Sequence, residues 1–219
     1  MSTYAVSELV KEVKVLLDRN QESAGLLTPT DSDTLSQGEL IQSKIVDAAR
    51  IILKDAPASM LDGKTFDGLN TAWAETNGAY VGTVYQPSDM IRLLNVKASD
   101  WNRSAEIITE EDDAYKIQCS RFGVRGNSER PIAALIHNSG NRYLELFTSK
   151  SNTATVSLTY VGMPFISEGN IDLPETLKDS IVYMAGYLTC ISLGDTDTAS
   201  GLLGVARKLA HIVEPTETS

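Results

Sequence analysis

The order of its hydrophobic patterns limits what this chain can fold into more than any other feature. Both ends of the 219-residue sequence carry helix-type patterns, whereas the middle, from about Ala79 to Val161, has the short alternating runs that are typical of β-strands. The first helix-type pattern repeats apolar residues at intervals of three and four positions, and its members are Val6, Leu9, Val10, Val13, Leu16 and Leu17. We therefore expect a helical part with a β part inserted in it.

Capping signals delimit a second helix. Ser36 and Glu39 have the spacing of a capping box, in which the hydroxyl accepts one free backbone N–H and the carboxylate reaches back to another. Pro57 disfavours helical geometry in the residue before it. A helix is therefore expected from Ser36 to about Asp55.

Two more helices are expected near the C-terminus. Asp172 is a candidate cap for a helix that starts at Leu173, because Pro174 would then stand where its missing N–H costs nothing. A last helix is expected from about Thr198 to Val213. Its apolar face consists of Leu202, Val205, Leu209 and Ile212.

The middle third contains a series of short runs rich in strand-forming residues. They are Ala79–Tyr85, Ile91–Lys97, Ala105–Ile108, Ala114–Phe122, Ile132–His137, Tyr143–Thr148 and Thr155–Val161. Such strands, separated by turn residues, predict an antiparallel sandwich or barrel with Trp101 in its core. The predicted fold class is α+β: residues 1–66 and 168–219 form a helical bundle, and residues 67–167 form an inserted antiparallel β domain.

The charge of the chain restricts its partners. The net charge is −10 at neutral pH, and the segment after residue 167 holds eight acidic residues against three basic ones. Such a chain is unsuited to gripping a phosphate backbone, but nucleic acid could slide past it without adhering. Solubility alone explains the same charge. No apolar run is long enough to span a bilayer and no signal-peptide pattern opens the sequence, so a cytosolic protein without membrane contact is expected.

No pattern predicts a catalytic residue, a cofactor site or a metal site. The acidic run Glu110–Asp113 could hold a divalent ion, but calcium loops need alternating ligands and a glycine at a set place, so a solvated turn is the simpler interpretation. His137, His211, Cys119 and Cys190 show no zinc-ligand spacing. The two cysteines are expected to be buried, reduced thiols.

One short segment is basic. Arg121, Arg125 and Arg130 fall within ten residues of a predicted loop. These arginines are candidates for contact with a neighbouring subunit or with DNA, and an inert loop is the alternative. The negative charge of the whole chain disfavours the DNA contact.

Several short motifs carry a resemblance to a known family. They are Ile45–Arg50, Ala56-Pro57, Pro87–Leu93, the strand that ends at Asp100-Trp101, the Arg-Gly loop before Arg130-Pro131, and Arg142–Phe147. Over about residues 38 to 190, the chain resembles the head-to-tail connector proteins of tailed phages, above all the ring (adaptor) proteins of crAss-like and related gut phages.

The resemblance implies a non-enzymatic virion protein that is assembled in the host cytoplasm. Such adaptors form a ring, usually of twelve copies, between the portal and the tail. The implied partners are further copies of the chain, the portal protein and downstream tail or ring proteins, while genomic DNA passes through the lumen without sequence-specific binding. By analogy with other adaptors, Leu202, Leu209 and Ile212 are candidates for portal contact. A neck or tail-completion protein farther from the portal, and a metal-dependent hydrolase that uses Glu110–Asp113 or His137, are the alternatives.

Overall fold

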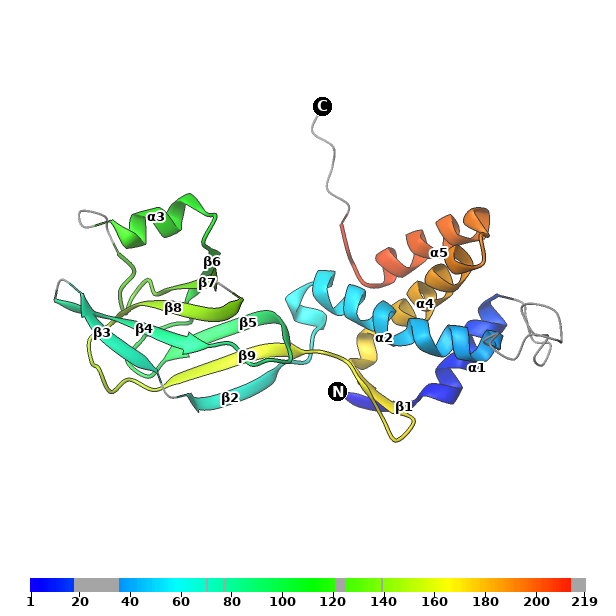
Figure 1. Ribbon diagram of the computed structural model, residues 1–219, viewed down its shortest axis with the longest axis horizontal. Helices are drawn as coiled ribbons and strands as arrows, with labels where there is room; N and C mark the ends of the chain where they lie inside the picture. Colours follow the sequence, from blue (N-terminus) through cyan, green and yellow to red (C-terminus); the bar gives the residue numbers. More distant parts are fainter. Residues whose placement is uncertain (18–35, 70, 77, 121–124, 139, 214–219) are drawn as a thin grey trace, which may run out of the picture. The chain divides into compact units, whose positions relative to one another are not determined.

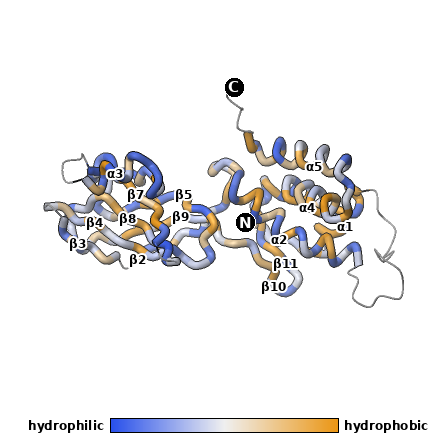
Figure 2. Tube along the Cα trace, turned by 45° about the horizontal axis from the view of Figure 1, so that its top comes forward, coloured by the Kyte–Doolittle hydropathy of each residue, from blue (hydrophilic) through white to orange (hydrophobic). Residues whose placement is uncertain are grey.

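The computed structural model describes residues 1–17, 36–69, 71–76, 78–120, 125–138 and 140–213. The chain divides into two compact units, which are labelled by element in Figure 1. The terminal unit comprises residues 1–62 and 163–219, and the middle unit comprises residues 63–162. Figure 2 shows that hydrophobic and hydrophilic stretches alternate along the elements of both units, as they do in elements that bury one side.

The terminal unit combines helices with a small antiparallel sheet. Its helices are α1 (Val6–Leu16), α2 (Gln37–Asp55), α4 (Lys178–Ser192) and α5 (Thr196–Leu209), with the short 3₁₀ turns η1 (Ala58–Met60) and η2 (Glu175–Leu177). Its sheet has the order β1 (Ser2–Ala5), β11 (Asn170–Leu173), β10 (Ile166–Ser167). Glu168 and Gly169, both with positive φ, form the two-residue turn between β10 and β11.

Helix α2 begins where the sequence predicts. The Ser36 backbone N–H donates to Glu39 Oε2 over 2.7 Å, and the Glu39 backbone N–H donates to Ser36 Oγ over 3.3 Å, so the capping box is confirmed. The helix ends at Asp55, as Pro57 requires. Its apolar side, which includes Ile41, Ile45 and Ile52, is buried.

Helix α4 is the centre of the terminal unit. It packs against α1, α2 and α5, and residues on nearly all of its sides are buried, among them Ile181, Met184 and Ala185. A helix that is apolar all round needs neighbours on every side. The core of this unit therefore forms around α4.

The predicted helical bundle is wrong. The residues before α1 form strand β1, which pairs with β11 across Ser2↔Leu173 and Ala5↔Asn170. Asp172 is not a helix cap, because its Oδ1 accepts a 2.6 Å hydrogen bond from Thr3 Oγ1 within this sheet. The terminal unit is thus a mixture of helices and strands. Strands of two to four residues are too short to show an alternating pattern, and β1 lies more than 160 residues from its partner β11.

The middle unit consists of two sheets and one helix. One sheet has the order β2 (Lys64–Leu69), β9 (Val156–Gly162), β5 (Met90–Ala98), and the other has the order β3 (Ala72–Thr76), β4 (Ala79–Tyr85), β8 (Asn141–Ser149), β7 (Ile132–Asn138), β6 (Glu106–Thr109). The sheets share one core, to which β5, β9, β4 and β8 all contribute. Trp101 is buried in it, and its Nε1 donates to the Thr148 carbonyl over 3.0 Å. The insertion is not purely antiparallel, because β6 and β7 run parallel.

The predicted strand Ala114–Phe122 is also wrong, because helix α3 (Asp113–Cys119) occupies most of it. Tyr115 packs edge-on against Phe147 with a centroid distance of 6.4 Å, and Gln118, one turn later, is buried. Contacts three and four residues apart fit a helix that lies on a sheet. Tertiary packing has therefore overridden the strand preference of Tyr115 and Ile117.

Candidate interaction surfaces

Helix α5 contacts the rest of the terminal unit through its small residues. Ala199, Ala206 and Ala210 are almost completely buried. The Ser180 hydroxyl of α4 donates to the Ala206 carbonyl over 2.8 Å, which requires the two helices to lie close together. Figure 1 shows α5 alongside α4. Leu203 is at helical spacing from Ala199 and Ala206 on the same side of α5 and is half-buried.

Three larger apolar side chains of α5 form a second row on the helix. Leu202, Val205 and Leu209 form this row, which we call the α5 stripe, and Ile212 lies beyond the helix, which ends at Leu209. Val205 and Leu209 are each 39% exposed, and Leu202 and Ile212 are half-buried. Leu202 owes its partial burial to its place beside Gly186, where an added Cβ would lie 3.5 Å from Leu202 Cδ1.

Of the predicted portal-contact residues, Leu202 and Leu209 lie on this side of α5. Ile212 does not, because the helix ends at Leu209 and His211 has a positive φ. Val205 is as exposed as Leu209, although it was not included in the predicted contact. Asp195 caps the N-terminus of α5 by accepting from the Thr198 N–H over 3.2 Å, and Arg207 and Lys208 stand in the last turn. The acidic residue at the N-terminus and the basic residues at the C-terminus of α5 both interact favourably with the helix dipole. An aliphatic row with charged ends is suited to contact with another protein surface.

Two of the three arginines in the predicted contact are in the described ranges, and Arg121 lies outside them. Arg125 is half-buried and donates through Nη1 to the Thr76 carbonyl over 3.3 Å. Arg130 is exposed and closes a turn, in which Asn127 Oδ1 accepts from its backbone N–H over 3.0 Å. Arg125 thus connects its loop to β3, whereas the Arg130 side chain is exposed, and contact of these arginines with a subunit or with DNA stays a prediction.

The acidic run Glu110–Asp113 serves the local structure. Asp112 Oδ2 accepts from both the backbone N–H and the hydroxyl of Thr109, over 2.7 and 3.0 Å, and these hydrogen bonds hold the pKa of the Asp112 carboxyl below its usual value. Asp113 pairs with Lys116 over 2.7 Å, and Glu110 accepts from the His137 backbone N–H over 3.4 Å. Across the part of the chain that the structure describes, no three acidic, histidine or cysteine side chains converge as a metal site.

The remaining chemical candidates lie apart from one another. His137 is exposed at the end of β7, and His211 is exposed just after α5 with a positive φ of 53°. Cys190 is a buried free thiol, as predicted, but Cys119 is exposed at the end of α3. The prediction of two buried thiols is therefore wrong for Cys119, whose segment forms a helix instead of an internal strand.

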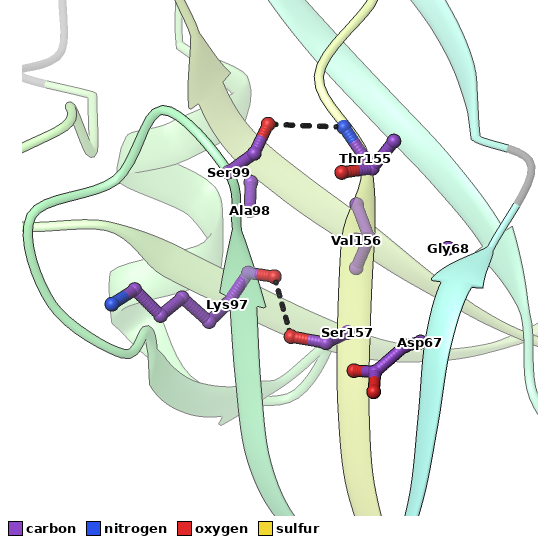
Figure 3. Close-up of a pocket in the computed structure, with 8 residues that line it drawn as sticks. All are labelled: Asp67, Gly68, Lys97, Ala98, Ser99, Thr155, Val156 and Ser157. Carbon is purple, nitrogen blue, oxygen red and sulfur yellow. Dashed lines mark hydrogen bonds between the residues drawn. The ribbon is translucent and has the colours of Figure 1, made fainter.

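A small pocket of about 200 Å³ lies on the three-stranded sheet of the middle unit. Figure 3 shows its lining from β2, β5, β9 and the adjoining residues Ser99 and Thr155, with the Lys97 ammonium directed away from the other lining residues. The Ser157 hydroxyl donates to the Lys97 carbonyl over 3.3 Å, and Ser99 Oγ accepts from the Thr155 N–H over 3.1 Å. These two hydroxyls form hydrogen bonds between neighbouring strands, so their role in the pocket is to hold the sheet together.

Comparison of the chain with protein-family models and with curated proteins finds no match. None of the helices in the described ranges is both long enough and apolar enough to cross a bilayer.

Proposed function

We propose that this chain is a structural subunit of a tailed-phage virion: an adaptor that forms a ring between the portal and the tail around the DNA channel. The α5 stripe is the observation that carries the proposal. Exposed aliphatic side chains in a continuous row are costly in water and are typical of surfaces that another protein covers. The stripe contains Leu202 and Leu209, two of the three residues that are candidates for portal contact by analogy with other adaptors.

The division of the chain supports a role with more than one partner. Each unit has its own core, and the chain passes between the units at residues 62–63 and again at 162–163. In the proposed ring, the terminal unit binds the portal through α5, and the middle unit meets tail or ring proteins. Contacts between copies in such a ring are heterologous, because a different face of each copy meets the next.

The net charge fits a protein that surrounds a DNA channel. At −10, the chain repels the phosphate backbone as a whole. DNA would therefore pass without being retained, whereas a cationic lumen would release counterions and bind it.

The test is assembly on the portal. The full chain is mixed with the portal protein of the same phage, and the complex is isolated by sedimentation and imaged by negative-stain electron microscopy. We expect an additional ring on the portal. The double variant Val205→Asp/Leu209→Asp should reduce the bound fraction at least about tenfold, because two charges would be buried without partners in the contact.

The matched control is Ile117→Asp on α3, which also places a charge at an exposed apolar position (50% exposed) but in the middle unit. It should bind the portal like the unaltered chain. Absence of an added ring with the unaltered chain would overturn the proposed function. If the α5 double variant bound the portal as well as the unaltered chain, the stripe would not be part of the portal contact.

A further inference from the structure

The five-stranded sheet of the middle unit has an outer face that α3 covers only in part. Tyr115 and Ala114 of α3 pack over Phe147 and Ala134 near the β6 side of this face. Glu145 is at the border of the covered part, where its Oε2 accepts a 2.9 Å hydrogen bond from the Tyr115 hydroxyl. Beyond Glu145 the same face is hollowed.

The hollow is a groove of about 330 Å³, which we call the sheet groove. It is lined by residues of β4, β7 and β8: Thr83, Tyr85, Asn138, Asn141, Tyr143 and Glu145. Tyr85 is opposite Tyr143 in the strand register, and Thr83 is opposite Glu145. Opposed residues on one face of a sheet have their Cβ atoms about 5 Å apart, so the two tyrosines are direct neighbours.

Tyr85 is the most conspicuous member of the groove, because 73% of its surface is exposed. Tyr143 is half-buried beside it. An exposed tyrosine offers a flat apolar ring face and a hydroxyl at its edge. The pair therefore forms a platform on which another flat, partly apolar molecule can stack.

Hydrogen-bonding side chains stand on both sides of this platform. Asn138 and Asn141 are opposite each other at the hairpin end of β7 and β8, and amides both donate and accept. Glu145 is at the other end, and the bond from Tyr115 restricts its carboxylate before any ligand arrives. Burial, together with hydrogen bonds to Cys119 and Glu145, raises the pKa of Tyr115, so this phenol stays protonated and continues to donate at neutral pH.

We propose that the sheet groove binds a short neutral oligosaccharide. A sugar ring presents C–H groups on its faces and hydroxyls around its rim, and this matches two tyrosine ring faces flanked by amides, a carboxylate and a hydroxyl. From Asn141 to Glu145 the groove follows five residues of β8, which span about 13 Å at the usual rise of a strand. That length suits a short oligosaccharide better than a single sugar.

Charge and lining distinguish this ligand from the other flat or extended candidates. Glu145 in the groove and the net charge of −10 disfavour phosphates, and with them single-stranded nucleic acid. Acidic sugars are disfavoured for the same reason. The six lining residues include two tyrosines and four hydrogen-bonding residues but no aliphatic side chain, which fits a hydroxylated ligand better than an alkyl chain.

The experiment is a titration of the ¹⁵N-labelled full chain with six neutral probes: maltohexaose, cellohexaose, xylohexaose, mannohexaose, chitohexaose and laminarihexaose. Hexagalacturonate and an oligothymidylate are the charged comparisons. We expect at least one neutral probe to shift the backbone resonances of β4 and β8 in a saturable manner. Tyr85→Ala should weaken that binding about tenfold or more, because it removes the stacking surface, and it should leave the fold intact, because the side chain is mostly in water.

The matched control is Phe66→Ala, which removes another exposed aromatic side chain (51% exposed) from the other sheet of the same unit. It should bind the sugar unchanged. Glu145→Gln keeps an acceptor for Tyr115 and should weaken binding less than Tyr85→Ala. The proposal is overturned if no neutral probe binds at millimolar concentration, if Tyr85→Ala binds as well as the unaltered chain, or if the charged probes bind in preference. These outcomes are independent of portal assembly.

Discussion

The two units of this protein expose different kinds of surface. The terminal unit exposes aliphatic side chains in the α5 stripe, which contains no hydrogen-bonding side chain. The middle unit exposes tyrosines among amides and a carboxylate in the sheet groove. An aliphatic surface gains only from being covered by another apolar surface, whereas an aromatic and polar surface can satisfy a hydroxylated ligand.

The difference follows from how each element is packed. Helix α5 turns its alanines toward the core and leaves Val205 and Leu209 exposed, so its apolar residues are divided between a buried and an exposed side. The five-stranded sheet buries one face in the shared core, and α3 covers part of the other face. In both units the exposed surface consists of side chains that the core does not use. Mutations in either surface should therefore leave the core intact.

The largest expected effect tests whether the two units also unfold independently of each other. Leu146→Ala in the middle unit and Ile45→Ala in the terminal unit each empty a fully buried site. Each should lower the free energy of unfolding of its own unit by about 2–5 kcal/mol, from lost burial and the cavity left behind. Hydrogen exchange followed by mass spectrometry should show faster exchange in the mutated unit alone. Equal acceleration in both units would mean that they unfold together.

A smaller effect tests the division of α5 into two sides. Ala206→Leu adds volume where α5 touches α4, next to the bond from Ser180, and should cost about 1–3 kcal/mol by overpacking. Val205→Leu, one residue earlier on the exposed side, is the control and should change the free energy of unfolding by less than about 0.5 kcal/mol. Urea unfolding of both variants measures the difference. If Ala206→Leu were tolerated as well as Val205→Leu, the close contact of the two helices would be wrong.

The sequence predicted those elements whose signals are local. Ser36, Glu39 and Pro57 are close in sequence to the helix ends that they determine, and α2 begins and ends as they indicate. The apolar row of α5 was also visible, because it repeats at helical spacing. Its exposure was not, because that depends on Ala199, Ala206 and Ala210 packing against α4.

The remaining features depend on residues far apart in sequence. β1 is a strand only because β11 pairs with it, and neither is long enough to show a pattern. α3 is a helix because Tyr115 reaches Phe147 and Glu145, some thirty residues later. The sheet groove likewise combines three strands. Tyr85 and Tyr143 could have drawn notice as aromatic residues near strand ends, but nothing local indicates that they stand side by side.

The smallest expected effect concerns the middle unit in acid. Asp89 Oδ2 accepts from Lys64 Nζ over 3.0 Å, and Asp89 Oδ1 accepts from the Tyr160 hydroxyl over 3.1 Å. Burial raises the pKa of the Asp89 carboxyl, but these two hydrogen bonds outweigh it and hold the pKa below its usual value. A pKa that is lower in the folded state than in the unfolded chain, about 3.9, means that the carboxylate stabilises the fold above that pH. The contribution is lost as the pH falls through the folded-state pKa.

Because Asp89 and Lys64 are both substantially exposed, at 42% and 44% of their side chains, the contribution should be below about 1 kcal/mol. Asp89→Asn keeps one acceptor, for Lys64, places an amide donor beside the Tyr160 hydroxyl, and cannot titrate. The unaltered chain should therefore be slightly more stable than Asp89→Asn at pH 6, and the advantage should shrink as the pH falls toward 3. Urea unfolding at both pH values, followed by the fluorescence of Trp73 and Trp101, measures it. A difference that persists unchanged at pH 3 would show that the carboxylate's charge is not what stabilises this site. In that case the positive charge of Lys64 would contribute nothing beyond its hydrogen bond to residue 89.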